Sequence, residues 1–403
     1  MPVAMSAPTA DWVSLEALTA DPIRVFARLR EEAPIAWVPT LGRYLVTTYA
    51  GCRAVESDGD VFGPARERSL MLRSIGPNML TKGDPAHAVE RAAVNPSLRP
   101  RAMHEIWGAI FARNAERALR HLIDAGPGAD LAVHFAEPFA AANLAALVGL
   151  AHVDAALISE WSAAFIGAVG NHADDPDACE RNRVANEQIG EHLDEAIDRV
   201  RRTPDPSMLS GLVNSPVPLP EDVIRANIKL AIAGGVNEPQ HTMTNGVWAL
   251  ATHPEQRDAV LARPELWPAV FEEVVRWLSP IQSLTRQVFA PTRLEGVDLA
   301  AGDQVMAILA SANRDPQHFD RPDVFDIHRE RRPHLGFGAG IHLCAGSWSS
   351  RSAIAQFAWP LLYQRLEGLR PVDPSRAQWT GFGFRGLTEL PVTWDHVKEG
   401  TDA

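Results

Sequence analysis

The sequence has few cysteines and none of the long hydrophobic runs of a membrane protein. Its 403 residues contain three cysteines, Cys52, Cys179 and Cys344. An odd, widely spaced set does not form a disulfide framework and fits a reducing compartment, so we expect a cytoplasmic protein. The N-terminal segment lacks a basic region followed by an apolar one, so we expect no signal peptide. The most apolar stretch (PFAAANLAALVGLAHV) is interrupted by Pro138 and Asn143 and predicts a buried helix.

An excess of positive charge is also absent. The formal net charge is -12 at pH 7, and an acidic chain repels nucleic acid and anionic lipid. We therefore expect neither nucleic acid nor a membrane as a partner. Hydrophobic residues make up 46% of the chain and charged residues 22%, a balance that argues against disorder.

The pattern of apolar residues predicts a mainly helical protein with small β-sheets. Two stretches, residues 35–49 and about 283–309, are rich in β-branched and aromatic residues and predict a small β-rich part, with a turn at 296–298 in the second. A period of 3.6 residues predicts helices over 102–124, 131–150, 186–202, 221–252 and 267–278.

The helix predicted over 221–252 has an unusual middle, residues 233–239 (AGGVNEP). Glu221 and Asp222 place negative charge in its first turn, which favours a helix N-terminus. Pro239 cannot donate to the carbonyl of Gly235, which predicts a kink with a small polar notch. Two separate helices with a break between them are the alternative.

The segment 337–346 (FGAGIHLCAG) carries the strongest indication of chemistry. Its glycines allow a tight backbone beside a flat ligand, and a predicted helix follows Cys344 closely. Loop amides and a helix N-terminus both favour a thiolate at Cys344. The alternatives are a buried structural thiol, a zinc site with His342, for which no second Cys or His pair has suitable spacing, and a phosphate loop, which lacks the usual Lys-Ser/Thr.

This segment resembles the haem-binding signature of the cytochrome P450 superfamily, FGxGxHxCxG. Glu273 and Arg276 match the ExxR motif of that family, and residues three apart on a helix can pair. Residues 313–316 (NRDP) and the later Phe319, Pro322, Phe325 and Arg329 match the segment before the loop. The resemblance implies a mainly α fold with small β-sheets in one domain, 1–403, with a long kinked helix over the haem. It also implies a soluble bacterial-type monooxygenase.

The resemblance assigns roles to particular residues. Cys344 is the axial ligand of the iron of haem b, and Phe337, Gly338 and Gly346 belong to the same loop. The propionates of the haem are bound by His87, Arg91, Arg286 and His342 through charge-assisted hydrogen bonds. In the family, Glu273, Arg276 and Arg329 form a buried charge network.

The chain departs from the family pattern in the kinked helix. Most members carry an acid followed by threonine there, and these groups deliver protons to dioxygen. In this chain Asn237 occupies the position of the acid and Glu238 that of the threonine. We expect Glu238 to deliver protons, with Asn237 and the carbonyl of Gly235 as anchors for water. The alternative is that Glu238 points away and pairs with a base such as His241.

A narrower resemblance concerns residues 237–241 (NEPQH), in which an amide residue is followed by Glu, Pro, any residue and His. It also concerns the segments 381–386 (GFGFRG) and 392–394 (VTW). These are similar to a subgroup that includes guaiacol-type aromatic O-demethylases. The similarity implies a small aromatic substrate resembling a methoxyphenol. The lining of its apolar pocket is then Ile75, Phe165, Leu230, Gly234, Ile281, Thr285 and Phe384.

No flavin or iron–sulfur domain follows the last motif, so we expect electrons to come from NAD(P)H through a separate ferredoxin or iron–sulfur flavin reductase. Arg99, Arg101 and Arg351 are candidate contacts for that acidic partner. Three alternatives stay open: hydroxylation of another natural product such as a terpenoid or polyketide, a peroxide-driven peroxygenase, and a haem-binding sensor or carrier without catalytic activity.

Overall fold

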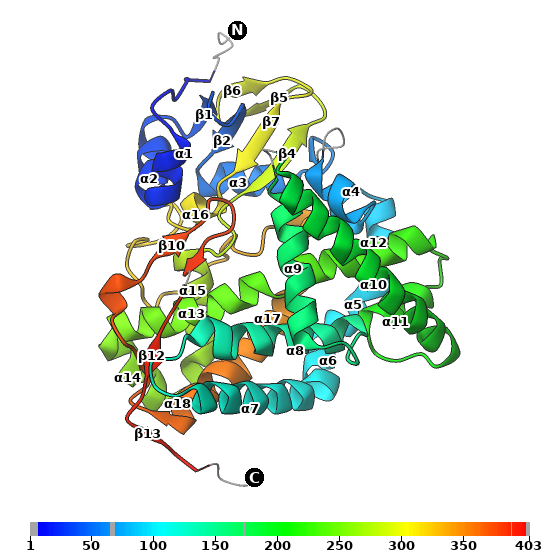
Figure 1. The fold of residues 1–403 in the computed structure, drawn as a ribbon. Coiled ribbons are helices and arrows are strands. Elements are labelled where there is room, and N and C mark those ends of the chain that lie inside the picture. Colours follow the sequence, from blue (N-terminus) through cyan, green and yellow to red (C-terminus); the bar gives the residue numbers. More distant parts are fainter. Residues whose placement is uncertain (1–6, 65–68, 172–173, 388, 400–403) are drawn as a thin grey trace. The chain divides into compact units, whose positions relative to one another are not determined.

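The computed structural model of the chain describes residues 7–64, 69–171, 174–387 and 389–399, and it divides into two compact units (Figure 1). Unit 1 comprises Met1–Ala65, Ala269–Cys344 and Gln378–Thr388. Unit 2 comprises Arg66–Pro268, Ala345–Ala377 and Glu389–Ala403. The prediction of a single domain over 1–403 stays a prediction. Among the described residues, no helix is both long and apolar enough to cross a membrane.

Unit 1 is built on a five-stranded sheet with the order β1-β2-β7-β4-β3. The hairpin predicted near 35–49 is confirmed, because β1 and β2 pair antiparallel with Ile35 opposite Val46. The predicted turn at 296–298 is partly wrong, because the turn begins one residue earlier and shares only Gly296 with the prediction. Glu295 and Gly296 take the positive φ angles of the turn, and β6 already begins at Val297. The strands of the sheet and this hairpin are β1 (Ile35–Val38), β2 (Arg43–Val46), β3 (Phe62–Gly63), β4 (Leu284–Val288), β5 (Thr292–Leu294), β6 (Val297–Leu299) and β7 (Gln304–Ala307).

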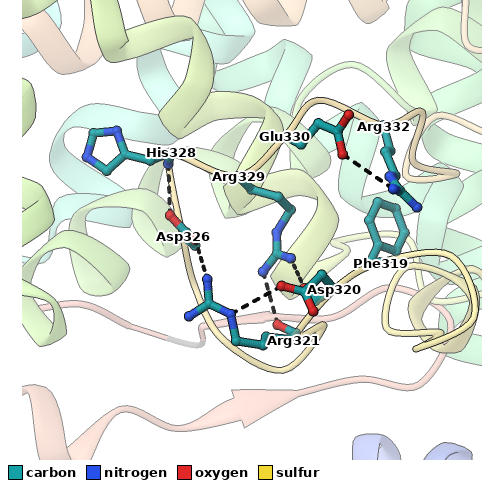
Figure 2. A pocket seen from close by; sticks show the side chains of 8 residues that line it. All are labelled: Phe319, Asp320, Arg321, Asp326, His328, Arg329, Glu330 and Arg332. Carbon is teal, nitrogen blue, oxygen red and sulfur yellow. Dashed lines mark hydrogen bonds and ion pairs between the residues drawn. The ribbon is translucent and has the colours of Figure 1, made fainter.

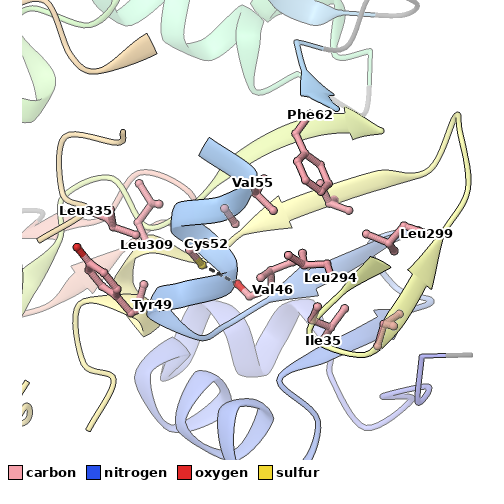
Figure 3. Packing of buried hydrophobic residues seen from close by; sticks show 14 of the residues in the cluster. Ile35, Val46, Tyr49, Cys52, Val55, Phe62, Leu294, Leu299, Leu309 and Leu335 are labelled. Atoms are coloured by element: carbon pink, nitrogen blue, oxygen red, sulfur yellow. Dashed lines mark hydrogen bonds between the residues drawn. The ribbon is translucent and has the colours of Figure 1, made fainter. Parts of the chain in front are cut away.

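One face of this sheet is covered by a short helix, α3 (Tyr49–Ser57), as Figure 3 shows. Cys52 and Val55 point from the helix into a cluster that includes Val46 and Phe62. The Cys52 thiol donates to the carbonyl of Val46 over 3.0 Å, and burial raises its pKa well above the ordinary value. Cys52 is therefore a structural thiol that fixes α3 against the sheet. The other elements of unit 1 are α1 (Leu15–Ala20), α2 (Pro22–Glu32), α15 (Trp267–Leu278, which begins at the end of unit 2), α16 (Leu309–Ala312), η5 (Gly340–His342), β10 (Trp379–Thr380) and β11 (Gly386–Leu387).

Unit 2 is mainly helical, and its helices begin where local caps favour them. The helix predicted over 186–202 begins earlier, at Pro176, because Asp175 caps it by accepting from the backbone of Asp177 over 3.1 Å. The first half of that helix is mostly polar, so the 3.6-residue period of apolar residues is not visible there in the sequence. The helices from the first half of the chain are α4 (Leu70–Ile75), η1 (Met79–Thr81), α5 (Ala86–Leu98), α6 (Pro100–Ala102), η2 (Met103–Trp107), α7 (Gly108–Ala125), η3 (Ala132–Ala136), α8 (Glu137–Val148), α9 (Ala155–Val169) and α10 (Pro176–Arg202).

The long helix predicted over 221–252 is two helices, α12 (Glu221–Ala233) and α13 (Asn237–Thr252). The prediction that Pro239 kinks a continuous helix is wrong. The break lies earlier, at 234–236, and Pro239 stands in the first turn of α13, where a missing N–H disrupts no hydrogen bond. The remaining elements of unit 2 are α11 (Met208–Val213), α14 (Pro254–Ala262), η4 (Pro264–Leu266), α17 (Ser347–Ser352), η6 (Ala353–Ala358), α18 (Trp359–Arg365), β8 (Leu366–Glu367), β9 (Arg370–Pro371), η7 (Pro374–Arg376), β12 (Val392–Thr393) and β13 (His396–Val397).

A buried charge cluster joins α15 to the segment that follows it in unit 1. The Glu273 carboxylate accepts two hydrogen bonds from Arg276, each 2.7 Å long, and both residues are at most 5% exposed. Arg329 lies 3.3 Å from the same carboxylate. Arg276 also donates to the carbonyl of Asn313 over 2.8 Å. Because buried charges are tolerated only when they are paired and hydrogen-bonded, the cluster fixes these segments together.

Replacing Glu273 with glutamine removes the negative charge at nearly constant volume. We expect the free energy of unfolding to fall by about 3–5 kcal/mol, because Arg276 is left as an uncompensated buried charge. Guanidinium unfolding followed by circular dichroism measures the change. The matched control is Glu330→Gln, which breaks an exposed pair with Arg332 and is expected to cost under about 1 kcal/mol. Equal losses for the two variants would contradict the proposed role of the cluster.

Candidate active site

The loop that carries Cys344 is held by its own backbone. The amide of Cys344 donates to the carbonyl of Phe337 over 3.0 Å, and the amide of Gly338 donates to the carbonyl of Leu335 over 2.8 Å. The Cys344 side chain is exposed, unlike that of Cys52. The helix predicted after it begins as α17, at Ser347. The loop therefore presents a thiol at the end of a tightly folded turn.

Gly340 shows why this loop needs glycine. Its φ of +65° lies in the left-handed region, and a Cβ there would lie 2.3 Å from the carbonyl oxygen of Glu56. The loop backbone thus rests directly on the end of α3. Asn313 supports the start of the same segment, because its Oδ1 accepts from the amide of Leu335 over 2.7 Å. The charge cluster and the cysteine loop are connected through this asparagine.

Arg286, a predicted propionate contact, lies on β4 and is 5% exposed. Its guanidinium donates to the buried carboxylate of Glu56 over 2.7 Å, and to the carbonyl of Thr285 over 3.0 Å. Burial raises the pKa of Glu56, and Arg286 opposes that rise. The sequence analysis missed Glu56, because a glutamate on an ordinary helix gives no sign of a partner so distant in the chain.

Two further predicted propionate contacts, His87 and Arg91, lie one turn apart on α5 in unit 2. His87 is 4% exposed, and its Nδ1 lies 3.2 Å from a carboxylate oxygen of Asp84. Arg91 donates to the side chain of Asn95 over 2.9 Å. Their spacing places both on one side of the helix. The fourth predicted contact, His342, lies in η5 of unit 1.

The break between α12 and α13 brings Glu238 back over Gly234. Glu238 Oε1 lies 4.0 Å from the position of a Cβ on Gly234, one turn earlier. Glu238 Oε2 is inaccessible to solvent and has no hydrogen-bond partner among the described residues. Burial raises the pKa of Glu238 to about 8, although a hydrogen bond from its own backbone opposes the shift.

The neighbours of Glu238 show that the break depends on close packing. Asn237 begins α13. A Cβ on Gly235 would meet Leu144 of α8 at 2.5 Å and the carbonyl of Ala231 at 2.7 Å, so only glycine fits. The alternative pairing of Glu238 with His241 does not occur, since His241 Nδ1 is buried and without a hydrogen-bond partner in the described part of the chain.

Three of the predicted substrate contacts belong to unit 1. Ile281 and Phe384 face each other across an isolated antiparallel bridge. The hydroxyl of Thr285, on β4, accepts from Arg43 over 3.1 Å. The structure thus brings Ile281 and Phe384 together although they are far apart in the sequence.

The other four predicted substrate contacts belong to unit 2. Ile75 on α4 and Phe165 on α9 are 3% and 0% exposed, and these two helices pack against each other. Leu230 is half-buried on α12, and Gly234 is exposed at the end of that helix. The accessible part of this set is therefore the end of α12, next to Glu238, and the complete lining stays a prediction.

A separate small cavity of about 220 Å³ lies in unit 1 beside Arg329 (Figure 2). Figure 2 shows that charged side chains surround it, with Arg321 beside Asp326 and Arg332 beside Glu330. None of the predicted substrate contacts lines it. Its polar, ion-paired lining does not suit an apolar substrate.

The candidate contacts for a redox partner lie in unit 2. Arg101 is exposed and pairs with Glu105 over 2.8 Å, whereas Arg99 precedes α6. Arg351 lies over the ring of Trp348, 5.3 Å from its centroid, and Trp348 is half exposed. An exposed tryptophan beside an arginine is a common composition for a binding surface.

Comparisons with known proteins agree with this geometry. A family model described as Cytochrome P450 matches residues 181–357. The chain is 32% identical to mycinamicin IV hydroxylase/epoxidase of Micromonospora griseorubida over 395 residues, 92% of this chain and 94% of the relative. It is 30% identical to pentalenic acid synthase of Streptomyces avermitilis over 400 residues, 93% and 94%. The crystal structure of P450BioI with an acyl carrier protein bearing hexadec-9Z-enoic acid has a TM-score of 0.85 and 29% identity, covering 93% of this chain and 98% of that one.

The chain belongs to the cytochrome P450 family and is a monooxygenase. The family uses haem b and O2 with electrons from NAD(P)H, which pass through redox partners. The cysteine loop fits that cofactor, because it presents one exposed thiol on a backbone that has no room for a side chain at Gly340. The zinc alternative is not supported, since the described residues contain no cluster of three His, Cys, Asp or Glu able to hold a metal ion.

The narrower resemblance to aromatic O-demethylases is not supported by these relatives, which are named for the biosynthesis or oxidation of other compounds. The motifs behind this resemblance are a few short segments, whereas the similarity to these relatives covers 92% and 93% of the chain. The comparisons therefore define the class of enzyme and leave its substrate open.

Replacing Cys344 with alanine removes the thiol and leaves the loop hydrogen bonds in place. We expect a folded protein whose reduced, carbon monoxide-treated form lacks the Soret band of a thiolate-ligated haem, because the band depends on the axial ligand. The control is Cys179→Ser, which changes an exposed thiol on α10 and keeps the band. A thiolate-type band in the Cys344 variant would show that another residue is the ligand.

Proposed function

We propose that this cytochrome P450 oxidises a small, mainly apolar substrate and that Glu238 supplies protons for the activation of O2. The observation that carries the proposal is the carboxyl of Glu238, which lies at the break between α12 and α13 with a buried oxygen that has no partner among the described residues. A buried carboxyl oxygen without a partner is costly, and buried acids with raised pKa values are concentrated at functional sites.

The residues that would hold the haem are those of the cysteine loop together with four basic side chains. Cys344 would ligate the iron, and the propionates would take hydrogen bonds from His87, Arg91, Arg286 and His342. When bound, the haem supplies the chemistry that cleaves O2 and oxidises the substrate, and its thiolate ligand favours O–O cleavage. The protein then has to position the substrate and control the arrival of protons.

Glu238 suits the second task through its protonation state. With its pKa raised to about 8, the carboxyl is mostly protonated at pH 7 and can donate a proton from Oε1 or Oε2. A carboxylic acid is a stronger donor than the threonine found at this position in most of the family. Asn237 directly precedes Glu238 in the chain, and Gly235 lies shortly before them. The side chain of Asn237 and the carbonyl of Gly235 can hold the water that reprotonates Glu238.

The substrate is proposed in two steps of decreasing generality. The exposed end of α12 and the paired Ile281 and Phe384 favour a small apolar molecule. Within that class we propose a methoxylated aromatic compound. The support is the resemblance of residues 237–241 and 381–386 to the aromatic O-demethylase subgroup. The second candidate is hydroxylation of another natural product such as a terpenoid or polyketide. Relatives named mycinamicin IV hydroxylase/epoxidase and pentalenic acid synthase are consistent with it.

We further propose that the electrons come from an iron–sulfur partner, either a ferredoxin or an iron–sulfur flavin reductase. The support is three basic residues, Arg99, Arg101 and Arg351, on a chain of net charge -12. A cytoplasmic location is proposed on the small, odd number of cysteines, Cys52, Cys179 and Cys344.

Product formation per NAD(P)H consumed tests the role of Glu238. We expect this coupling to be high at pH 7 and to fall as the pH rises through 8, because the proton-donating form of Glu238 is lost there. Glu238→Gln should couple poorly and show no such fall. Glu255→Gln, an exposed acid on α14, serves as the control and should keep the wild-type profile.

A Glu238→Gln variant with wild-type coupling and pH profile would overturn the proton-donor role. Peroxide-driven turnover gives a second readout, because a carboxyl can act on hydrogen peroxide as general base and acid. If Glu238→Thr left peroxide-driven turnover unchanged, the peroxygenase alternative would lose its basis.

Titration of the ferric enzyme with methoxyphenols and methoxybenzoates, and in parallel with macrolide and terpenoid compounds, tests the substrate class. We expect a low-to-high-spin shift with methoxylated aromatics, and formaldehyde release during their turnover. A shift with the second group alone would discard O-demethylation and keep the monooxygenase. No shift with any compound of either group would show that the substrate belongs to neither class.

A further inference from the structure

The helix α13 carries three polar side chains with unsatisfied atoms in the interior of unit 2. These atoms are Glu238 Oε2, His241 Nδ1, and both the Oδ1 and Nδ2 of Asn245. Each is inaccessible to solvent and has no hydrogen-bond partner among the described residues. Asn245 is 0% exposed as a whole residue, so its amide cannot reach bulk solvent.

The three side chains lie on one face of the helix. They occupy positions i, i+3 and i+7, and with about 100° of rotation per residue they fall within about 60° of one another. Neighbours at such spacings have Cβ atoms roughly 5–6 Å apart. Two hydrogen bonds of about 2.8 Å through one water molecule span that distance.

The hydroxyls of two threonines on the same helix are satisfied within it. The hydroxyl of Thr242 donates to the carbonyl of Glu238 over 2.7 Å, and that of Thr244 donates to the carbonyl of His241 over 3.1 Å. These threonines therefore need no outside partner. The unsatisfied atoms are confined to the face that Glu238, His241 and Asn245 share.

The free-energy cost of buried polar atoms without partners indicates that this face of α13 binds further groups. A buried polar group without a partner costs about 1–3 kcal/mol, and buried side-chain groups almost always have a protein or water partner. Four such atoms on one face would be a large cost for a structural feature alone. Ordered water is the partner that fits, because these atoms include donors and acceptors within the reach of single water molecules.

His241 has the chemistry to pass a proton along this face. Burial lowers its pKa to about 4, so the imidazole is neutral at pH 7. A neutral imidazole has one donor and one acceptor nitrogen and can accept a proton on one side while it releases a proton on the other. Asn245 cannot titrate, but its amide can orient water as both donor and acceptor.

We propose that His241 and Asn245 continue the route of proton supply from Glu238 along α13, as side chains joined by ordered water. Protons move through this route toward Glu238, and His241 is neutral before and after each transfer. The proposal rests on the proposed function, in which Glu238 is the donor. His241 and Asn245 are positioning and relay residues, whereas Glu238 alone is placed at the reacting end.

A second set of amides gives unit 2 a connection to its surface. Asn143 on α8, a helix that packs against α13, is 4% exposed and has an unpartnered Nδ2 in the described part of the chain. Its Oδ1 accepts from Asn114 on α7 over 2.7 Å. Asn114 in turn accepts from Arg117 over 2.8 Å in an exposed contact. Polar groups thus reach from the neighbourhood of α13 to solvent.

The test uses the haem-loaded enzyme with its reductase and compares His241→Leu and Asn245→Leu with wild type. We expect product per NAD(P)H to fall at least about fivefold in each, with more peroxide released and a larger solvent isotope effect in D2O. His241→Gln keeps a donor and an acceptor that can orient water but cannot pass a proton, so it should restore only part of the coupling. Thr244→Val, which removes a hydroxyl satisfied within the helix, is the matched control and should couple as wild type.

Two further readouts separate a relay from a structural role. The thermal midpoint of Asn245→Leu should stay close to that of wild type, because the change replaces a water-bound amide by an apolar group of similar volume. The substrate-induced spectral shift and the reduced carbonyl spectrum should be unchanged. Lower coupling that appears only together with lost haem, weaker substrate binding or a lowered midpoint would overturn the relay.

The outcome for Glu238→Gln keeps the two proposals distinguishable. If Glu238→Gln uncouples the enzyme while His241→Leu and Asn245→Leu couple normally, Glu238 is the donor and the route along α13 is wrong. If Glu238→Gln couples normally, the proton-donor role of Glu238 is wrong. The route along α13 depends on that role and is then wrong as well. Uncoupling in all three variants supports both.

Discussion

The ion pair between Glu273 and Arg276 places two full charges where almost no water reaches. Such a pair is stable only when further hydrogen bonds satisfy it, and here these come from the segment between Asn313 and Arg329. Asn313 then connects the cluster to Leu335, at the start of the cysteine loop. The buried ion pair thus helps to fix the position of the thiol, and a loop whose only regular element is the short η5 acquires the rigidity that an axial ligand requires.

Much of this arrangement could be predicted from the sequence because its signals are local or fixed in spacing. The hairpin at 35–46, the helix α15 and the cysteine loop follow from alternation, period and glycine placement. The break before α13 was placed wrongly, because a proline in a first turn is indistinguishable in sequence from a proline that kinks a helix. The pairing of Arg286 with Glu56 had no sequence signal, since it joins a strand to a helix far away in the chain. Asn245 was missed because a single asparagine in a helix is usually solvated or structural.

Membership of a family and identity of a substrate rest on different parts of this molecule. The family is shown by relatives and a fold that match this chain over most of its length, and the loop and the ExxR pair are its motifs in the sequence. The substrate depends on a few apolar side chains and on the glutamate that stands at the usual position of a threonine. Relatives named for mycinamicin IV or pentalenic acid therefore say little about this pocket. The chemistry peculiar to this chain is concentrated in α13, where an acid, an imidazole and an amide share one face.

The contact between Gly340 and the end of α3 has a consequence for how this protein can change over evolutionary time. The loop backbone lies against the carbonyl of Glu56 with no space for even a methyl group. An inserted or deleted residue in α3 would rotate that carbonyl and displace the loop, whatever the rest of the chain did. The lengths of these two distant segments are therefore inherited together, and length variation among relatives should accumulate in the surface connections instead.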